Sequence, residues 1–256
     1  MSENKKGLQR IDNGKGHWYK LDGEKADGVT TLLGNGIPKP ALINWAGNTT
    51  AEYAVDNWEE LSALSPSARL NELKKSRFKV RDAAAKRGTE VHALADLLLQ
   101  GKEVEVPDEL AGHVDAYVRF LNEFEPKPVL TEFRVASRKW RYCGTADMVI
   151  DLPDGRFIAD IKTSKSGIFG ETALQLAAYR YADFYVDSEG AEQPMDSLGI
   201  TGALGIWVRG DGYDVLPIEA GEREFKDFLH AAWVARWTGR ARSLVGSSVR
   251  PNGVAA

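Results

Sequence analysis

The chain has 256 residues, 43% of them apolar, and its 33 Lys and Arg residues against 37 Asp and Glu residues give a formal net charge of −4. A chain of this length buries roughly 70–75% of its unfolded surface and needs no covalent cross-links to hold a core. The single cysteine, Cys143, excludes an intramolecular disulfide and a zinc or iron–sulfur site built from several cysteines of one chain. The net charge argues against a protein that coats nucleic acid, but it leaves room for a local basic groove.

The sequence shows neither a signal peptide nor a run of ~18 apolar residues, which predicts a soluble, cytoplasmic protein without a membrane partner, in the host cytoplasm if the gene is carried by a phage. We expect one domain over residues 1–246, with a flexible N-terminal arm over residues 1–16 and a disordered tail over residues 247–256. A strand or hairpin is predicted over residues 17–33, followed by a turn at residues 34–40.

The part from residue 41 to residue 125 is predicted to be mainly helical. Ser65-Pro66 is typical of a helix start, and Gly101 is typical of a helix end. The periodicity of apolar residues predicts helices over residues 41–60, 78–100 and 108–124.

The part from residue 129 to residue 245 is predicted to form a core of strands and helices. Strands are expected at residues 129–135, 140–151, 156–163, 200–208 and 213–218, and helices at residues 170–186 and 222–244. This order predicts a mixed α/β domain in which helices pack on a sheet.

A hairpin with its turn at residues 152–155 brings two acidic residues together. If residue 152 pairs with residue 155, Asp147 lies opposite Asp160 and the other face of the hairpin is wholly apolar. A register shifted by one residue would mix polar and apolar side chains on both faces. We therefore predict the first register, in which the two facing carboxylates have Cβ atoms ~5 Å apart.

Two facing carboxylates are destabilising unless a cation or a proton lies between them. Lys162 lies on the same face as Asp160, because side chains alternate along a strand. Two acids and a lysine can hold a divalent metal and position a water, and such hard oxygen ligands favour Mg²⁺ or Mn²⁺ over zinc. The alternative is a surface charge cluster in which Lys162 only neutralises Asp160.

The helix predicted after this hairpin carries a polar stripe among alanines and leucines. Glu171, Gln175 and Tyr179 are four residues apart and therefore share one face of the helix. This stripe either faces the acidic hairpin or forms a solvated edge of the helix.

Four short motifs follow one another along the chain: Arg87-Gly88-Thr89-Glu90-Val91-His92, Gly144-Thr145-Ala146-Asp147, Asp160-Ile161-Lys162-Thr163 and Gln175-Leu176-Ala177-Ala178-Tyr179. Together with residues 28–33 and 39–45 they resemble the RecB-like branch of the PD-(D/E)XK nuclease superfamily, especially phage-encoded exonucleases. The resemblance covers residues 17–186, and the order of the motifs is more specific than a single Asp-x-Lys. It implies a restriction-endonuclease-like α/β fold, with a mixed sheet flanked by helices and a helical N-terminal half.

The resemblance also implies a role for each motif residue. Lys162 would orient or activate the attacking water, while Gln175 and Tyr179 would position the DNA end or the groups around the metal. Asp147 and Asp160 would both be catalytic and bind the metal. The implied metal ligands are His92, Asp147, Asp160 and the carbonyl of Ile161, while Glu132 matches a less constant acidic position that would bind the metal directly or through a water.

One departure from the family concerns cofactors. The CRISPR-associated relatives of this branch carry four cysteines for an iron–sulfur cluster, and Cys143 alone cannot supply them. No phosphate-binding Gly-x-x-x-x-Gly-Lys-Ser/Thr motif accompanies the nuclease motifs. We therefore expect a standalone nuclease that uses Mg²⁺ or Mn²⁺ and has no iron–sulfur cluster.

Contacts to DNA are expected from two basic regions. Residues 73–88 hold seven basic side chains against one acidic side chain, and a second basic cluster surrounds the loop before the acidic hairpin. Phosphate contact is our interpretation, and a solvated helix face is the alternative. Trp140 would stack on a base, or alternatively pack in the core. The DNA-binding candidates are Lys74, Lys75, Lys79, Arg81, Arg87, Arg138, Trp140 and Thr163.

These features predict a metal-dependent exonuclease that hydrolyses DNA phosphodiester bonds in recombination, repair or phage genome processing. The alternatives are a structure-specific endonuclease that acts on DNA branches or flaps, an RNase, and a catalytically inactive DNA-binding module of the same fold. DNA is the expected partner. A recombinase or a single-strand annealing protein is a candidate protein partner, and oligomerisation would be another source of processivity.

Overall fold

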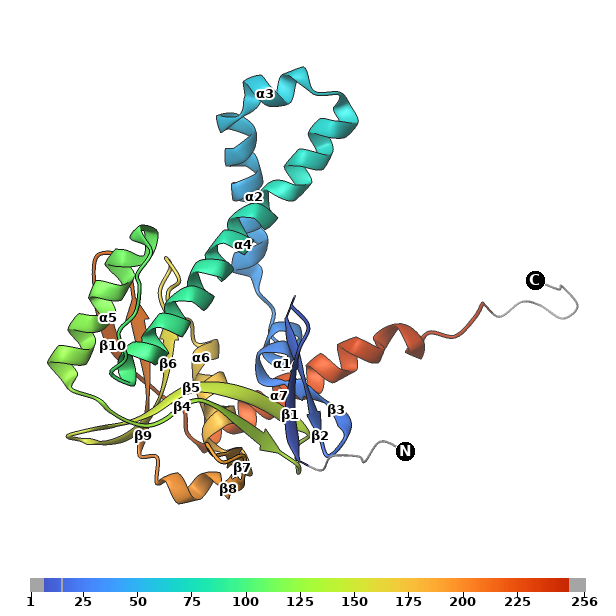
Figure 1. Ribbon diagram of the computed structural model, residues 1–256. Helices are drawn as coiled ribbons and strands as arrows, with labels where there is room; N and C mark the ends of the chain where they lie inside the picture. Colours follow the sequence, from blue (N-terminus) through green and yellow to red (C-terminus); the bar gives the residue numbers. More distant parts are fainter. Residues whose placement is uncertain (1–6, 15, 249–256) are drawn as a thin grey trace, which may run out of the picture.

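The computed structural model describes residues 7–14 and 16–248 (Figure 1). Within these residues, ten strands form one mixed sheet whose main path runs β10-β9-β6-β5-β4-β7-β8, with β3, β2 and β1 joined at the start of β5. The β3–β5 and β6–β9 pairs are parallel, and the other pairs are antiparallel. The strands are β1 (Leu8–Asp12), β2 (His17–Leu21), β3 (Glu24–Gly28), β4 (Lys127–Ser137), β5 (Tyr142–Leu152), β6 (Gly155–Lys162), β7 (Phe184–Val186), β8 (Glu192–Pro194), β9 (Gly202–Val208) and β10 (Tyr213–Ile218).

Helices cover both faces of the sheet. On one face, α1 (Val29–Gly36), α6 (Glu171–Arg180) and α7 (Glu222–Arg240) bury their apolar sides against the strands. On the other face, α5 (Ala111–Phe124) and the C-terminal third of α4 (Pro66–Leu99) form a second core cluster. This arrangement confirms a mixed α/β domain with helices on a sheet. Among the described helices, none combines the length and the apolar character needed to cross a lipid bilayer.

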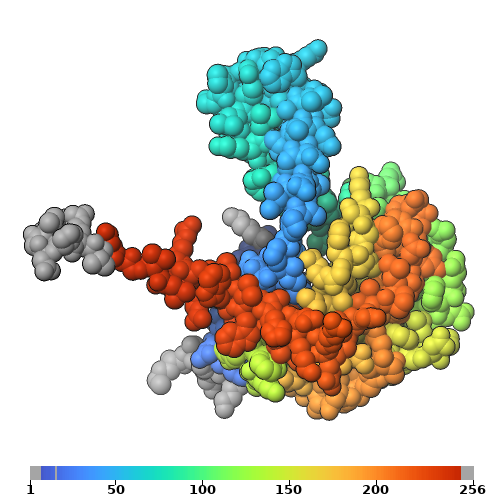
Figure 2. All heavy atoms as spheres, turned by 180° about the vertical axis from the view of Figure 1, so that it is seen from behind, coloured from blue at the N-terminus to red at the C-terminus, as the bar shows by residue number. Residues whose placement is uncertain are grey.

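A helical projection, residues 40–87, rises from this body (Figures 1 and 2). It consists of α2 (Pro40–Asp56), α3 (Trp58–Ala63) and the first two thirds of α4. Prolines open both α2 and α4, and the Ser65 side chain accepts a hydrogen bond from the backbone N–H of Ala68 at 3.4 Å, which caps α4. None of the residues of α2 is buried, so the body does not support this helix along its length.

The predicted register of the acidic hairpin is confirmed. β5 and β6 pair from Leu152 opposite Gly155 to Met148 opposite Ala159, and the next step of this register sets Asp147 against Asp160. The strand boundaries also agree within a few residues for β4, β5, β6, β9 and β10. The apolar face selected this register because a slip would have moved charged side chains into the core.

Several predicted elements were wrong in extent. Residues 8–12 of the expected flexible arm form β1, because Leu8 is buried against the inner side of β2 and β7. Residues 29–36 form α1 and not a strand, since Val29, Leu32 and Leu33 have helical spacing. The predicted tail lies largely outside the described residues, as do residues 1–6.

The remaining differences concern helix limits. The helix expected from residue 78 starts at Pro66, and the one expected over residues 41–60 is interrupted at Asn57. The helix expected over residues 170–186 ends at Arg180, after which residues 184–186 form β7 by pairing with β4. Residues 184–186 form a strand because they pair with β4, which is distant in the sequence, and local periodicity carries no signal for such a pairing.

Close packing of α1 on α7 gives a test of this fold. A methyl group at Gly36 would lie 2.0 Å from the backbone oxygen of Ala231 on α7, whereas one at Gly34, two residues earlier on α1, would meet nothing within 4 Å. We predict that Gly36→Ala lowers the free energy of unfolding by about 1–3 kcal/mol. Gly34→Ala should leave it unchanged or raise it by up to about 1 kcal/mol. Urea denaturation of both variants measures the difference, and equal stability would contradict the packing.

Candidate metal centre

The site lies where β5 changes its neighbour. Along one edge, β5 pairs with β3 at Tyr142 and Cys143 and with β6 from Met148 onward, so residues 144–147 lie between the two pairings. At this point the backbone N–H of Ile161 donates to the Asp147 carboxylate at 2.8 Å. The change of partner opens a pocket of about 640 Å³ in the side of the sheet.

Three carboxylates stand in a row across neighbouring strands. Asp147 on β5 and Asp160 on β6 come directly after the last pair of these two strands, Met148 with Ala159. Glu132 on β4 lies between the residues that pair with Met148 and Ala146, the two neighbours of Asp147 in the sequence. Glu132 has a φ of 44°, in the left-handed region that a residue with a side chain rarely adopts. Such a conformation costs on the order of 1–3 kcal/mol and is typical of functional sites.

His92 of α4 completes a group that can hold a metal. One ligand atom from each of His92, Glu132 and Asp147 lies within 4.8 Å of the other two, and His92 Nδ1 is 3.3 Å from Asp147 Oδ2. Two carboxylates and an imidazole are suitable ligands for a divalent cation. Asp160 lies on the other side of Asp147 and faces a different set of partners.

The partners of Asp160 come from its own strand and from α6. The Lys162 ammonium is 2.5 Å from Asp160 Oδ2, and Gln175 Nε2 donates to Asp160 Oδ1 at 2.8 Å. Gln175 also accepts a hydrogen bond from Lys162 at 3.4 Å and donates one to the Tyr179 hydroxyl at 3.4 Å. These contacts hold the lysine over a carboxylate that is only 2% exposed.

Burial and mutual charge set the protonation of this cluster. Burial raises the pKa of Asp160 to about 6, and the charge of Asp147 adds to that increase. Burial alone would raise the pKa of Asp147 and lower that of His92, but their attraction outweighs it: the pKa of Asp147 falls below its usual range and that of His92 rises to about 9. Enclosure in the pocket, followed by the charge of Asp147, raises the pKa of Glu132 to about 7. In the absence of a metal ion, protons on His92 and Glu132 together with the Lys162 ammonium offset the carboxylate charge, a role that a bound cation would take over.

The glycine of the second motif is required by the packing of α6. A methyl group on Gly144 would lie 2.4 Å from the ring of Tyr179, so the tyrosine rests directly on the β5 backbone. This contact brings Tyr179 and Gln175 to the pocket, whereas Glu171 binds Lys39 at the base of the helical projection, with 3.0 Å between Nζ and Oε1. The polar stripe of α6 thus divides between the pocket and the projection.

The sequence patterns did not single out one wall of the pocket. The N-terminal strands supply Arg10, His17 and Tyr19, and the Tyr19 hydroxyl makes hydrogen bonds of 2.9 Å with Thr145 Oγ1 and of 3.2 Å with His17 Nε2. Asp96 of α4 also lines the pocket. The N-terminal residues gave no signal, because their contacts join distant segments, whereas Asp96 follows His92 by four residues on α4, a spacing that could have identified it.

The predicted DNA-binding residues occupy three places. Arg138 lies apart from the pocket, in ion pairs with Asp22 and Glu192, and Trp140 packs partly buried against the core. Thr163 Oγ1 lies beside Gly88 on α4, next to the pocket. On the helical projection lie Lys74, Lys75, Lys79, Arg81 and Arg87.

Comparison with known proteins does not assign the chain to a family. No family model matches the chain, and no curated protein matches it in sequence. Among solved structures, one titled "Crystal structure of SSO0001" is similar at 14% sequence identity and a TM-score of 0.32, covering 86% of this chain and 76% of that one. Likeness at this level identifies neither a family nor a function.

The metal group can be tested by binding alone. We predict that Glu132→Gln weakens Mn²⁺ binding by about tenfold or more, because it removes one anionic ligand of the group. Asp96→Asn removes a carboxylate that lines the same pocket outside the group, and it should have a smaller effect. Electron paramagnetic resonance of free Mn²⁺ measures both affinities, and a Glu132→Gln affinity equal to that of the unaltered protein would exclude Glu132 as a ligand.

Proposed function

We propose that the chain is a metal-dependent deoxyribonuclease of the PD-(D/E)XK type, acting as an exonuclease. The observation that carries this proposal is the meeting of three carboxylates, a histidine and a lysine in one pocket. They come from α4, β4, β5 and β6, and four of the five belong to the motifs that resemble RecB-like nucleases. A charge cluster that only stabilised the fold would not require Glu132 to adopt a strained, left-handed backbone conformation.

The chemistry follows from the charge of the substrate. A phosphodiester is anionic, so hydrolysis requires an attacking water in line with the leaving group and positive charge near the phosphoryl oxygens. His92, Glu132, Asp147 and Asp160 are the residues that would hold Mg²⁺ or Mn²⁺, which when bound lowers the pKa of a water and polarises the phosphate.

The protein itself supplies the second positive charge. Lys162 is held by Asp160 and Gln175 with its ammonium in the pocket, where it orients a water and offsets charge that develops on the phosphate. Gln175 links Lys162, Asp160 and Tyr179, so it fixes their positions relative to one another.

The depth of the site supports an exonuclease. Asp160 is nearly fully buried, and the wall of Arg10, His17 and Tyr19 faces α4 across the pocket. A backbone phosphate at a strand end reaches such a recess with less distortion than one inside a closed duplex. DNA is therefore the proposed substrate, and recombination, repair or phage genome processing the proposed context.

The test uses purified protein with Mg²⁺ or Mn²⁺ and linear and circular DNA, each single- and double-stranded. We expect the protein to degrade linear substrates, and Asp160→Asn to lower the rate by roughly 100-fold or more, because it removes a charge from the site and keeps the hydrogen-bonding shape.

The matched control is Asp151→Asn on the same hairpin, whose carboxylate pairs with Arg156 and does not line the pocket. It should retain the rate of the unaltered protein. Cleavage of circles would favour an endonuclease, and no hydrolysis of any substrate would favour a binding module of the same fold.

A further inference from the structure

The helical projection exposes an aromatic ring between two cations. Phe78 of α4 is 40% exposed, and the guanidinium groups of Arg77 and Arg81 lie over its ring, 4.8 Å and 4.9 Å from the ring centre. A nucleic acid base that stacks on this ring takes the place of a guanidinium, which can then bind an adjoining phosphate.

One face of α4 leads from this ring to the metal centre. Residues three or four apart on a helix are neighbours on its surface, and this spacing joins the pocket-lining part of α4 to Phe78. We call this face the α4 track; its members are Lys74, Phe78, Arg81, Ala85, Gly88 and His92. Phe78 and His92 are 14 residues apart, which corresponds to about 21 Å along the helix axis.

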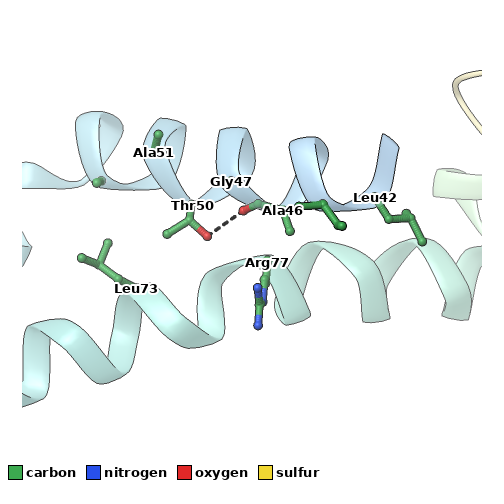
Figure 3. A pocket seen from close by; sticks show the side chains of 9 residues that line it. Leu42, Ala46, Gly47, Thr50, Ala51, Leu73 and Arg77 are labelled. Atoms are coloured by element: carbon green, nitrogen blue, oxygen red, sulfur yellow. Dashed lines mark hydrogen bonds between the residues drawn. The ribbon is translucent and has the colours of Figure 1, made fainter. Parts of the chain in front are cut away.

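α2 borders one flank of the track, whereas the track itself is open. α2 lies along the flank of α4 that carries Leu73 and Arg77, and the two helices border a shallow groove (Figure 3). Lys74, Phe78, Arg81 and Ala85 are all exposed. The short side chain of Ala85 lets a bound strand approach the helix after Arg81, and beyond it Thr163 Oγ1 lies beside Gly88.

The charge near the track favours an anionic occupant. Residues 73–88 hold seven basic side chains against one acidic side chain, Asp82, and Asp82 is held by Arg81 at 2.8 Å. A second copy of the chain would bring like charges together at this face. Lys75 and Lys79 lie on another side of α4, where both pair with Glu72.

We propose that the α4 track binds an unpaired DNA strand, with a base stacked on Phe78 and phosphates on Lys74 and Arg81, and directs that strand to the pocket. A duplex exposes base planes only at its two end pairs, whereas an unpaired strand can expose every base, so the stacking favours a single strand. This inference rests on the proposed nuclease function for its biological meaning, but strand binding itself does not depend on hydrolysis.

The test measures binding without turnover. Full-length Asp160→Asn protein in the presence of EDTA is titrated into a fluorescein-labelled unpaired oligonucleotide and into a blunt duplex of the same sequence, with anisotropy as the readout. We expect tighter binding of the unpaired strand, and a Kd about tenfold higher when Phe78→Leu is added, because leucine keeps the apolar bulk and loses the ring.

Two further variants separate stacking from damage to the helix. Phe78→Trp keeps a planar ring and should retain the affinity. Trp58→Leu removes another exposed aromatic ring of the projection, at the start of α3 and off the track, and should also retain it.

Equal Kd values for Phe78→Leu and the unaltered residue would overturn the proposal and indicate simple electrostatic binding or an acidic protein partner. Equal affinity for duplex and unpaired strand would also overturn it. Binding that depends on Phe78, together with no hydrolysis by the unaltered protein, would support the track while overturning the nuclease function, so the two failures are distinguishable.

Discussion

Three carboxylates lie side by side across β4, β5 and β6 at the inner edge of a pocket, and their mutual repulsion is the constraint that the surrounding structure has to satisfy. The groups next to these carboxylates reduce their repulsion. His92 stands against Asp147, Lys162 against Asp160, and the Ile161 N–H donates to Asp147 where the sheet is opened. The low-dielectric surroundings that strengthen these attractions also strengthen the repulsion, so losing one partner leaves an uncompensated buried charge.

The sheet itself makes room for this row. β5 pairs first with β3 and then with β6, and the residues between the two pairings provide the motif that ends in Asp147. The N-terminal strands β1 and β2 are joined to the sheet through β3, and β2 brings the Tyr19 hydroxyl into a hydrogen bond with Thr145. A regular sheet would satisfy these backbone groups with a neighbouring strand and would leave no cavity for a phosphate. The break in pairing is therefore as much a part of the site as the charged residues.

The sequence predicted those parts of the structure whose signals are local. The hairpin register followed from its apolar face, because a shift by one residue would have mixed polar and apolar side chains. The motif residues His92, Asp147, Asp160, Lys162, Gln175 and Tyr179 line one pocket, and their catalytic and metal-binding roles stay predictions.

Contacts between distant segments escaped prediction. The pairing of β1 with β2 and of β7 with β4 buries Leu8 and Phe184 in one small cluster, and no periodicity in either segment reports it. The helix start at Ser65-Pro66 was recognised, but the continuity of α4 from there to residue 78 was missed. Between them, residues 66–77 contain only Leu70 and Leu73 as large apolar side chains, which gives no apolar stripe although leucine, lysine and arginine favour a helix.

That continuity has a mechanical consequence. No loop interrupts α4 between the exposed ring on the projection and the histidine in the pocket, so their separation is set by the rise of the helix and not by a flexible tether. A tethered site loses conformational entropy each time both ends engage one ligand, whereas a rigid rod has lost it already on folding. If the α4 track binds a strand as proposed, α4 acts as a ruler: the number of residues between Phe78 and His92 sets the distance from the bound base to the metal centre.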